Sequence, residues 1–178
     1  MPEPATTENW KDIPPVPDFR KPWGLQDLYV PDALGGDDLH YMKMREGLTA
    51  RALWISPSTN MWCNILKGRG GGLINRHYHP TDVWAYTLSG KWGYLEHDWT
   101  ARAGDFIYEP PGGSHTLVMY DCGEEPTAVL FLQRMPLIWI DEAGNPSGSV
   151  DVFEVIERLE NHYAATPLGR DYVKTLIR

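Results

Sequence analysis

Cysteine is scarce in this sequence, which has two, Cys63 and Cys122, among its 178 residues. Residues 1–21 contain no apolar segment of the kind that a secretory signal needs, so we expect no export. Without export, the default for two cysteines is a pair of reduced thiols. We therefore expect a cytoplasmic protein without a Cys63–Cys122 disulfide.

Long apolar runs and clustered basic residues are lacking as well. No run reaches the roughly 18 apolar residues that a transmembrane helix requires, so we expect no membrane span. Lys and Arg number 16 against 24 Asp and Glu, which gives a formal net charge of −8 and a pI near 5.2. A nucleic-acid surface needs clustered Lys and Arg, so this balance argues against a nucleic-acid partner.

Turn-forming and aromatic residues are abundant, with 17 Gly, 15 Pro, 8 Trp and 9 Tyr. The length suits one domain with a full hydrophobic core. Within it we expect a proline-rich arm over 1–25, a β-barrel over 26–140 and a helical segment over 141–178. Proline removes backbone donors and fixes φ, so the arm should be extended. It could wrap its own barrel, cover a neighbouring subunit, or form a partly ordered tail.

Short segments rich in β-branched and aromatic residues, bounded by Gly, Pro, Asn or Asp, predict an all-β barrel or sandwich in the middle of the chain. The expected strands are Leu48–Ser56, Met61–Lys67, Leu73–His79, Val83–Ser89, Trp92–His97, Phe106–Glu109, His115–Tyr120 and Ala128–Arg134. The turns at Ser89-Gly90-Lys91 and Ala103-Gly104-Asp105 read as hairpins.

The last third of the chain changes to helical periodicity. Apolar residues recur at helical spacing at Val152, Phe153, Val155, Ile156 and Leu159. Ser149 or Asp151 is suited to cap the start of this helix, and a second short helix is expected over Arg170–Arg178. We expect the first helix to pack on the outside of the barrel and assign it no catalytic role.

Three histidines have the spacing of a metal site. Successive side chains of a strand point to opposite faces, so His77 and His79 project from the same face and can converge on one ion. His115 follows a Pro-Pro-Gly-Gly turn that begins a new strand, which can supply a third imidazole. Three nitrogen ligands leave positions on a transition metal open for chemistry.

These spacings resemble the two motifs of the cupin superfamily. Gly71, His77, His79 and Gly90 fall in register with the first motif, and Gly104, Pro110, Gly112 and His115 with the second. Two positions depart from the pattern: Val83 stands where a Glu ligand is usual, and Met119 replaces an Asn. The resemblance implies a jelly-roll barrel (a double-stranded β-helix) that holds a metal through the three histidines. It also implies a homodimer or homotetramer, because cupins usually assemble.

Two carboxylates are candidates to complete the site. If Leu88 pairs with Trp92 across the Gly90 turn, Trp84 pairs with Glu96, and Glu96 would then face the missing carboxylate position. Alternatively Glu96 lies in an exposed turn and is merely solvated. Glu109, six residues before His115, is a candidate indirect support for the metal, and Glu96 and Glu109 are both candidates for the base that accepts a substrate proton. It could instead be a strand-end residue that binds an arginine.

Aromatic and apolar residues near the motifs are candidates for the wall of a substrate pocket. The candidates are Trp84, Tyr86, Tyr94, Leu117 and Met119. Arg76 and Tyr78 alternate with the histidines, so they should point to the opposite face. The histidines outside the motifs, at positions 40, 97 and 162, are expected to be packing or surface residues.

Longer blocks resemble the 2,4′-dihydroxyacetophenone dioxygenase family within the cupins. They are Trp23–Val30, Arg76–Pro80 and Tyr108–Thr116. This resemblance implies an Fe(2+) enzyme that uses O2 to split a small aromatic hydroxyketone, 2,4′-dihydroxyacetophenone, into 4-hydroxybenzoate and formate. A metal-dependent isomerase or hydrolase, and a non-enzymatic metal-binding sensor, stay open as alternatives.

Overall fold

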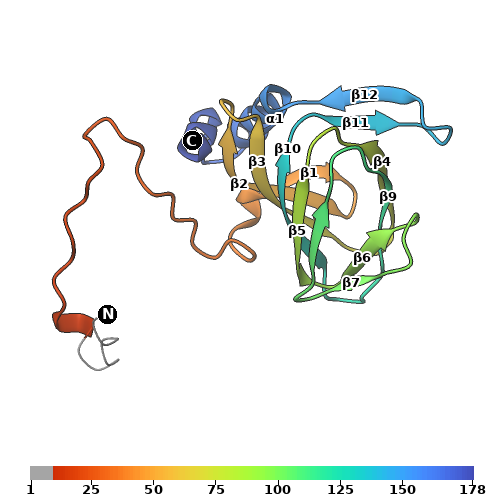
Figure 1. Ribbon diagram of the computed structural model, residues 1–178, viewed down its shortest axis with the longest axis horizontal. Helices are drawn as coiled ribbons and strands as arrows, with labels where there is room; N and C mark the ends of the chain where they lie inside the picture. Colours follow the sequence, from red (N-terminus) through yellow and green to blue (C-terminus); the bar gives the residue numbers. More distant parts are fainter. Residues whose placement is uncertain (1–9) are drawn as a thin grey trace.

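A computed structural model describes residues 10–178 and shows two six-stranded antiparallel sheets that close around a common core (Figure 1). The first sheet has the order β1-β2-β3-β10-β5-β8. Its strands are β1 (Met42–Arg45), β2 (Leu48–Ser56), β3 (Met61–Gly68), β10 (Thr127–Arg134), β5 (Val83–Ser89) and β8 (Phe106–Glu109).

The second sheet has the order β12-β11-β4-β9-β6-β7. Its strands are β12 (Pro146–Val150), β11 (Leu137–Ile140), β4 (Gly72–Tyr78), β9 (Ser114–Met119), β6 (Lys91–Tyr94) and β7 (Ala101–Arg102). Sequence neighbours such as β5 and β6 lie in different sheets, which is the connectivity of a jelly roll. The predicted all-β jelly-roll barrel is thereby confirmed.

The eight predicted strands are all present, and most of their ends agree within a residue. The exception is Trp92–His97, whose strand ends at Tyr94, where the backbone turns and the His97 N–H bonds the Tyr94 carbonyl at 3.1 Å. The sequence did not predict β1, β7, β11 or β12. These are short strands at or near the sheet edges, and β12 carries both Pro146 and Gly148 in an exposed segment.

The predicted hairpins at Gly90 and Gly104 are wrong, because each turn passes the chain from one sheet to the other. β5 pairs with β10 and β8, whereas β6 pairs with β9 and β7. Gly90 has a φ of +71°, and a Cβ there would lie 2.5 Å from the Cα of Thr127. This motif glycine therefore lets a barrel corner pass close to the neighbouring strand.

Replacement of Gly90 by alanine is expected to lower the free energy of unfolding by about 2–4 kcal/mol, from backbone strain and steric overlap together. Gly104→Ala is the matched control, since Gly104 also has a positive φ (+93°) but has no heavy atom within 4 Å of the added methyl group. Urea unfolding of both variants measures the difference. Equal losses would show that the contact with Thr127 does not restrict this position.

The C-terminal helix α1 (Val152–Ala164) closes one end of the barrel (Figure 1). Asp151 caps it by accepting hydrogen bonds from the Phe153 and Glu154 N–H groups, both at 2.9 Å. Its apolar face joins a cluster that also contains residues of β2, β3 and the 3-10 helix Arg170–Leu176. Two further short 3-10 helices cover Trp10–Asp12 and Asp38–His40.

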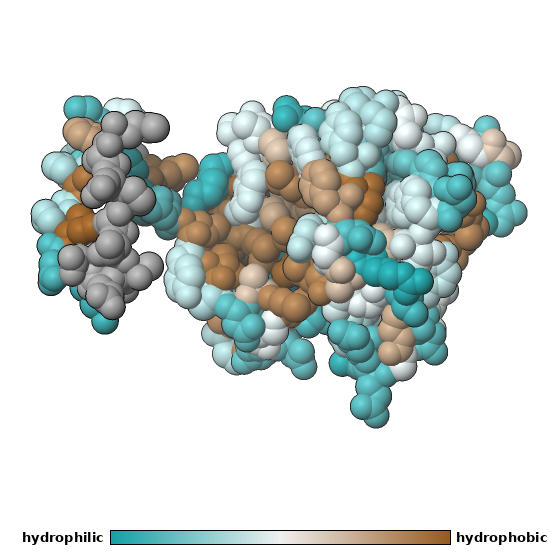
Figure 2. Space-filling view, turned by 60° about the horizontal axis from the view of Figure 1, so that its bottom comes forward, coloured by the Kyte–Doolittle hydropathy of each residue, from teal (hydrophilic) through white to brown (hydrophobic). Residues whose placement is uncertain are grey.

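The proline-rich arm runs away from the barrel in an extended path (Figure 1). Apolar side chains along its described part, including Val16, Phe19 and Trp23, are exposed rather than packed on the barrel. The start of the predicted arm, residues 1–9, lies outside the described residues. Figure 2 shows a broad hydrophobic area on the barrel face beside the arm, bordered by hydrophilic residues.

Both cysteines are free thiols, as expected: Cys63 is buried in β3 and Cys122 is partly exposed. Burial raises the pKa of the Cys63 thiol to about 11. Within residues 10–178, none of the helices has the length and apolar character needed to cross a bilayer.

Candidate metal centre

The candidate metal centre is built on the adjacent strands β4 and β9. His77 and His115 are directly opposite each other in the register of these strands. His79 lies just beyond the end of β4, where two backbone hydrogen bonds hold it to the glycine turn: His79 N–H to Gly113 O at 3.2 Å and Gly112 N–H to His79 O at 2.9 Å. The turn before β9 therefore fixes the position of the second histidine as well as the third.

Four side chains bring nitrogen and oxygen donors to one buried point. The Nε2 atoms of His79 and His115 lie 3.1 Å apart, and Glu109 Oε2 lies 2.9 Å from the first and 3.7 Å from the second. Donor atoms of His77, His79 and Glu109 all lie within 4.8 Å of one another. His79 and Glu109 are 0% and 3% exposed, so the carboxylate has little access to water.

Hydrogen bonds on the far side of two imidazoles orient their inward nitrogens. His79 Nδ1 lies 2.6 Å from the Thr81 carbonyl oxygen, which can only accept, so Nδ1 carries the proton. His77 Nδ1 likewise donates to Asn75 Oδ1 at 2.8 Å. Each ring therefore presents Nε2 to the centre, the arrangement by which outer hydrogen bonds orient metal-binding histidines.

Burial and the neighbouring charges shift the pKa values of these groups in different directions. Burial, with the adjacent His115, lowers the pKa of His77 to about 4, so this ring is neutral at pH 7. Burial also lowers the pKa of His115. Burial opposes the charge on His79 as well, but hydrogen bonds with Glu109 and Thr81 outweigh it and raise the pKa of His79.

Glu109 is held as an anion by its partners. Burial alone would raise the pKa of Glu109, but hydrogen bonds from His79 and Tyr94, with the nearby imidazoles, outweigh burial and lower it. The Tyr94 hydroxyl donates to Glu109 Oε1 at 2.6 Å, and the Tyr94 ring stacks on His115 with centroids 4.2 Å apart. Tyr94 thus orients both the carboxylate and an imidazole.

These residues fit a divalent transition-metal ion. Two imidazole nitrogens 3.1 Å apart beside one carboxylate need a proton or a cation among them, because their lone pairs otherwise repel. Neutral imidazoles suit iron, zinc, copper and nickel alike, so the donor set indicates a class of metal rather than one element. The buried Nδ1 of His115 has no hydrogen-bond partner among the described residues.

The strand pairing that made Glu96 a candidate ligand is wrong. Trp84 pairs with Leu132 and Tyr108, not with Glu96, because β5 and β6 belong to different sheets. Glu96 lies in the exposed turn after β6, where its carboxylate accepts a hydrogen bond from the Thr116 N–H at 2.8 Å. Among the described residues the carboxylate beside the imidazoles belongs to Glu109.

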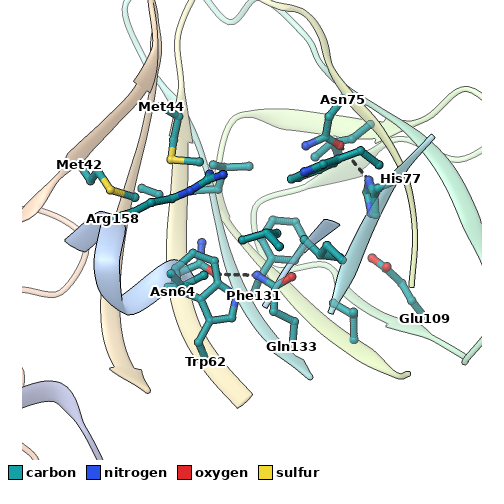
Figure 3. Close-up of a pocket in the computed structure, with 18 of the residues that line it drawn as sticks. Met42, Met44, Trp62, Asn64, Asn75, His77, Glu109, Phe131, Gln133 and Arg158 are labelled. Atoms are coloured by element: carbon teal, nitrogen blue, oxygen red, sulfur yellow. Dashed lines mark hydrogen bonds between the residues drawn. The ribbon is translucent and has the colours of Figure 1, made fainter. Parts of the chain in front are cut away.

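A cavity of about 90 Å³ opens from this centre toward β1, β11 and α1 (Figure 3). His77, Glu109 and Asn75 lie at one end. The remaining wall is mostly apolar and aromatic, with three polar side chains, those of Asn64, Gln133 and Arg158. Its apolar and aromatic part is formed by Met42, Met44, Ala50, Trp62, Leu66, Val83, Tyr94, Leu117, Phe131, Leu137, Trp139, Val150 and Val155.

Of the predicted wall residues, Tyr94 and Leu117 line this cavity. Trp84 and Tyr86 do not, because the side chains of β5 that face the core are those of Val83, Ala85 and Thr87. Tyr86 is 43% exposed.

Met119 is buried in the barrel core at the other end of β9 and does not line this cavity. Tyr78 and Arg76 alternate with the histidines as expected, and Arg76 pairs with Glu142 at 3.3 Å.

Sequence reasoning missed several residues of this region. Asn75 lies two residues before His77, so strand alternation could have placed it on the same face. Trp139, with its ring centroid 6.4 Å from that of His77, comes from the unpredicted strand β11. The Thr81 group that bonds His79 is a backbone carbonyl, so no side-chain type in the sequence could indicate this contact. Of the other histidines, His162 donates from Nε2 to the Leu39 carbonyl and His97 stacks on Trp99, in agreement with packing roles.

A jelly-roll barrel with a buried cluster of imidazoles and one carboxylate on its inner wall defines a cupin with the donor set of a metal centre. Residues 33–138, more than half of the chain, match the family model described as the ChrR cupin-like domain, and the chain belongs to this family. A search of curated proteins gave no match.

Solved structures agree with this fold. An RmlC-like cupin protein from Ralstonia eutropha JMP134 has a TM-score of 0.66 and 25% identity, over 71% of this chain and 82% of that chain. An acetylacetone dioxygenase from Acinetobacter johnsonii has a TM-score of 0.65 and 22% identity, over 84% of this chain and 99% of that chain. These similarities support the cupin assignment. The finer resemblance to 2,4′-dihydroxyacetophenone dioxygenases stays a prediction.

Proposed function

We propose that the protein is an Fe(2+)-dependent dioxygenase that cleaves the C–C bond beside the ketone of a small aryl α-hydroxyketone. The proposed reaction converts 2,4′-dihydroxyacetophenone and O2 into 4-hydroxybenzoate and formate, which balances because both oxygen atoms enter the products. His77, His79 and His115 are the proposed metal ligands. The observation that carries the proposal is that one cavity has an apolar, aromatic wall and, among its lining residues, His77 and Glu109, two members of the buried donor group His77, His79 and Glu109.

The imidazoles bear on the charge that the substrate should carry. His77 has a pKa of about 4 and is neutral, so it contributes no negative charge to the centre. A centre with few anionic ligands favours a chelating substrate that is itself deprotonated, such as the enediolate of a hydroxyketone. A bound ferrous ion would supply Lewis acidity toward the ketone oxygen and redox chemistry toward O2.

Glu109 is the proposed base. General-base catalysis needs a carboxylate that is ionised and within reach of the substrate proton. Glu109 is ionised, lines the cavity, and is oriented by hydrogen bonds with His79 and Tyr94. It would take a proton from the hydroxyl-bearing carbon or its hydroxyl group, while the apolar wall keeps bulk water from reactive oxygen species.

The fold similarity to the acetylacetone dioxygenase supports the same reaction class. That protein, by its name, acts on a diketone with O2, and this chain covers 99% of its length. Acetylacetone and an aryl hydroxyketone share two oxygens placed to chelate one ion. The aromatic residues Trp62, Phe131 and Trp139 in the cavity wall favour a ring-bearing substrate here.

The test is oxygen consumption by protein loaded with ferrous iron. We expect one O2 consumed per 2,4′-dihydroxyacetophenone, one formate and one 4-hydroxybenzoate formed, and no turnover without O2. Substrate loss under anaerobic conditions would instead show an isomerase or hydrolase. Bound zinc with no turnover of any hydroxyketone would favour a sensor.

A further inference from the structure

One cation lines the cavity at the side formed by the C-terminal helix. Arg158 lies on α1, beyond residues 33–138 of the family match and far in sequence from both metal motifs. Figure 3 shows its side chain extending past Met42 and Met44 toward the side of the cavity where Asn75 and His77 lie. Sequence analysis gave this helix no part in the site.

The guanidinium of Arg158 is held by one hydrogen bond to Glu154 and keeps other N–H donors that can bind a ligand. Its Nη2 atom donates to Glu154 Oε1 at 2.5 Å, one helical turn earlier. No other hydrogen bond of this guanidinium is found among the described residues, so Nη1 and Nε are available to a ligand. The side chain is 43% exposed, which places its charge at the mouth of the cavity rather than in the core.

A pair of amides lies on the same cavity wall. Gln133 Nε2 donates to Asn64 Oδ1 at 3.0 Å, and both side chains are buried and line the cavity (Figure 3). This hydrogen bond leaves the Asn64 amide as a donor and the Gln133 carbonyl as an acceptor. Arg158, Asn64 and Gln133 therefore give the apolar cavity a second polar region, separate from the imidazoles.

We propose that Arg158 is the specificity-determining residue that binds an acidic ring oxygen, a phenol or phenolate, at the end of the aryl ketone away from the metal. A guanidinium presents several N–H donors in a planar fork, which suits an oxygen acceptor better than a lone ammonium does. The amide pair can share the same hydroxyl, since it offers both a donor and an acceptor. This inference rests on the proposed function for the orientation of the ketone.

Binding of compounds that lack the reacting hydroxymethyl group tests Arg158 apart from turnover. We expect metal-loaded protein to bind 4′-hydroxyacetophenone about tenfold more tightly than acetophenone in titration calorimetry, the size of one partly exposed hydrogen bond to a charged group. Arg158→Met keeps the apolar stem and should erase this preference, whereas Arg158→Lys should keep part of it. Arg170→Met, which removes an arginine paired with Glu160 outside the cavity, should keep it in full.

The outcomes separate this inference from the proposed function. If hydroxyketones give no O2 uptake but Arg158→Met erases the preference for the ring hydroxyl, the proposed function fails and the role of Arg158 stands. If the wild type shows no preference, if the preference survives in Arg158→Met, or if neither compound binds, then Arg158 only covers the apolar mouth and the inference is overturned.

Discussion

Replacement of His77 by alanine is expected to remove the bound metal and to lower O2 uptake by at least about 100-fold, since the loss of residues that merely support a ligand already costs 10- to 100-fold. His77 faces the centre through Nε2, because Nδ1 is used on Asn75. Alanine provides no replacement donor, so only the imidazoles of His79 and His115 and the carboxylate of Glu109 remain at the centre. Metal content per chain and initial O2 uptake are the two measurements.

His162→Gln is the matched control for this variant. His162 is bonded to the Leu39 carbonyl, away from the centre, and glutamine can keep that hydrogen bond. We expect full metal content and full activity. A His77→Ala protein that keeps its circular dichroism spectrum, its iron and its turnover would contradict the proposed centre.

Replacement of Glu109 by glutamine is expected to reduce kcat about 100-fold, the usual contribution of a positioned acid–base group. Glutamine has nearly the same shape and can still accept from Tyr94, so the loss reports the charge and basicity of the carboxylate. Metal retention should weaken as well, by about tenfold, because the anion beside His79 is lost.

Glu96→Gln decides between the two carboxylates that the sequence offered. Its side chain bonds the Thr116 N–H from an exposed turn, a contact that the glutamine oxygen can keep. We expect activity within about threefold of the wild type, as for most surface substitutions. If Glu96→Gln is the inactive variant and Glu109→Gln the active one, the assignment of the base is wrong.

The sequence was sufficient to predict those features of the site and the fold that depend on local geometry. Strand alternation put His77 and His79 on one face, and the glycine turn before His115 aligned it with His77 across β4 and β9. The same kind of local rule limited the cap of α1 to Ser149 or Asp151, and Asp151 is the residue that caps it. These features depend on a few neighbouring residues, so short patterns are enough to find them.

Contacts created by barrel closure could not be predicted in this way, even where the residue itself was a candidate, as Glu109 was. Sequence proximity across Gly90 suggested that Glu96 faces Trp84, but the two strands belong to different sheets. Glu109 instead reaches His79 from β8, at the edge of the opposite sheet. Arg158 approaches from a helix whose amphipathic pattern predicts packing but does not say which cavity it closes.

The cavity is lined by two parts of the chain, one within the family match and one that follows it. The metal-facing end depends on strands within the family match, whereas part of the opposite wall comes from β12 and α1, which follow it. A change in the helix can therefore retune which molecules enter while the imidazoles stay in place. Proteins that share this barrel could therefore differ in ligand selectivity through changes in a short C-terminal segment. The same segment is a place to engineer selectivity without altering the metal-facing strands.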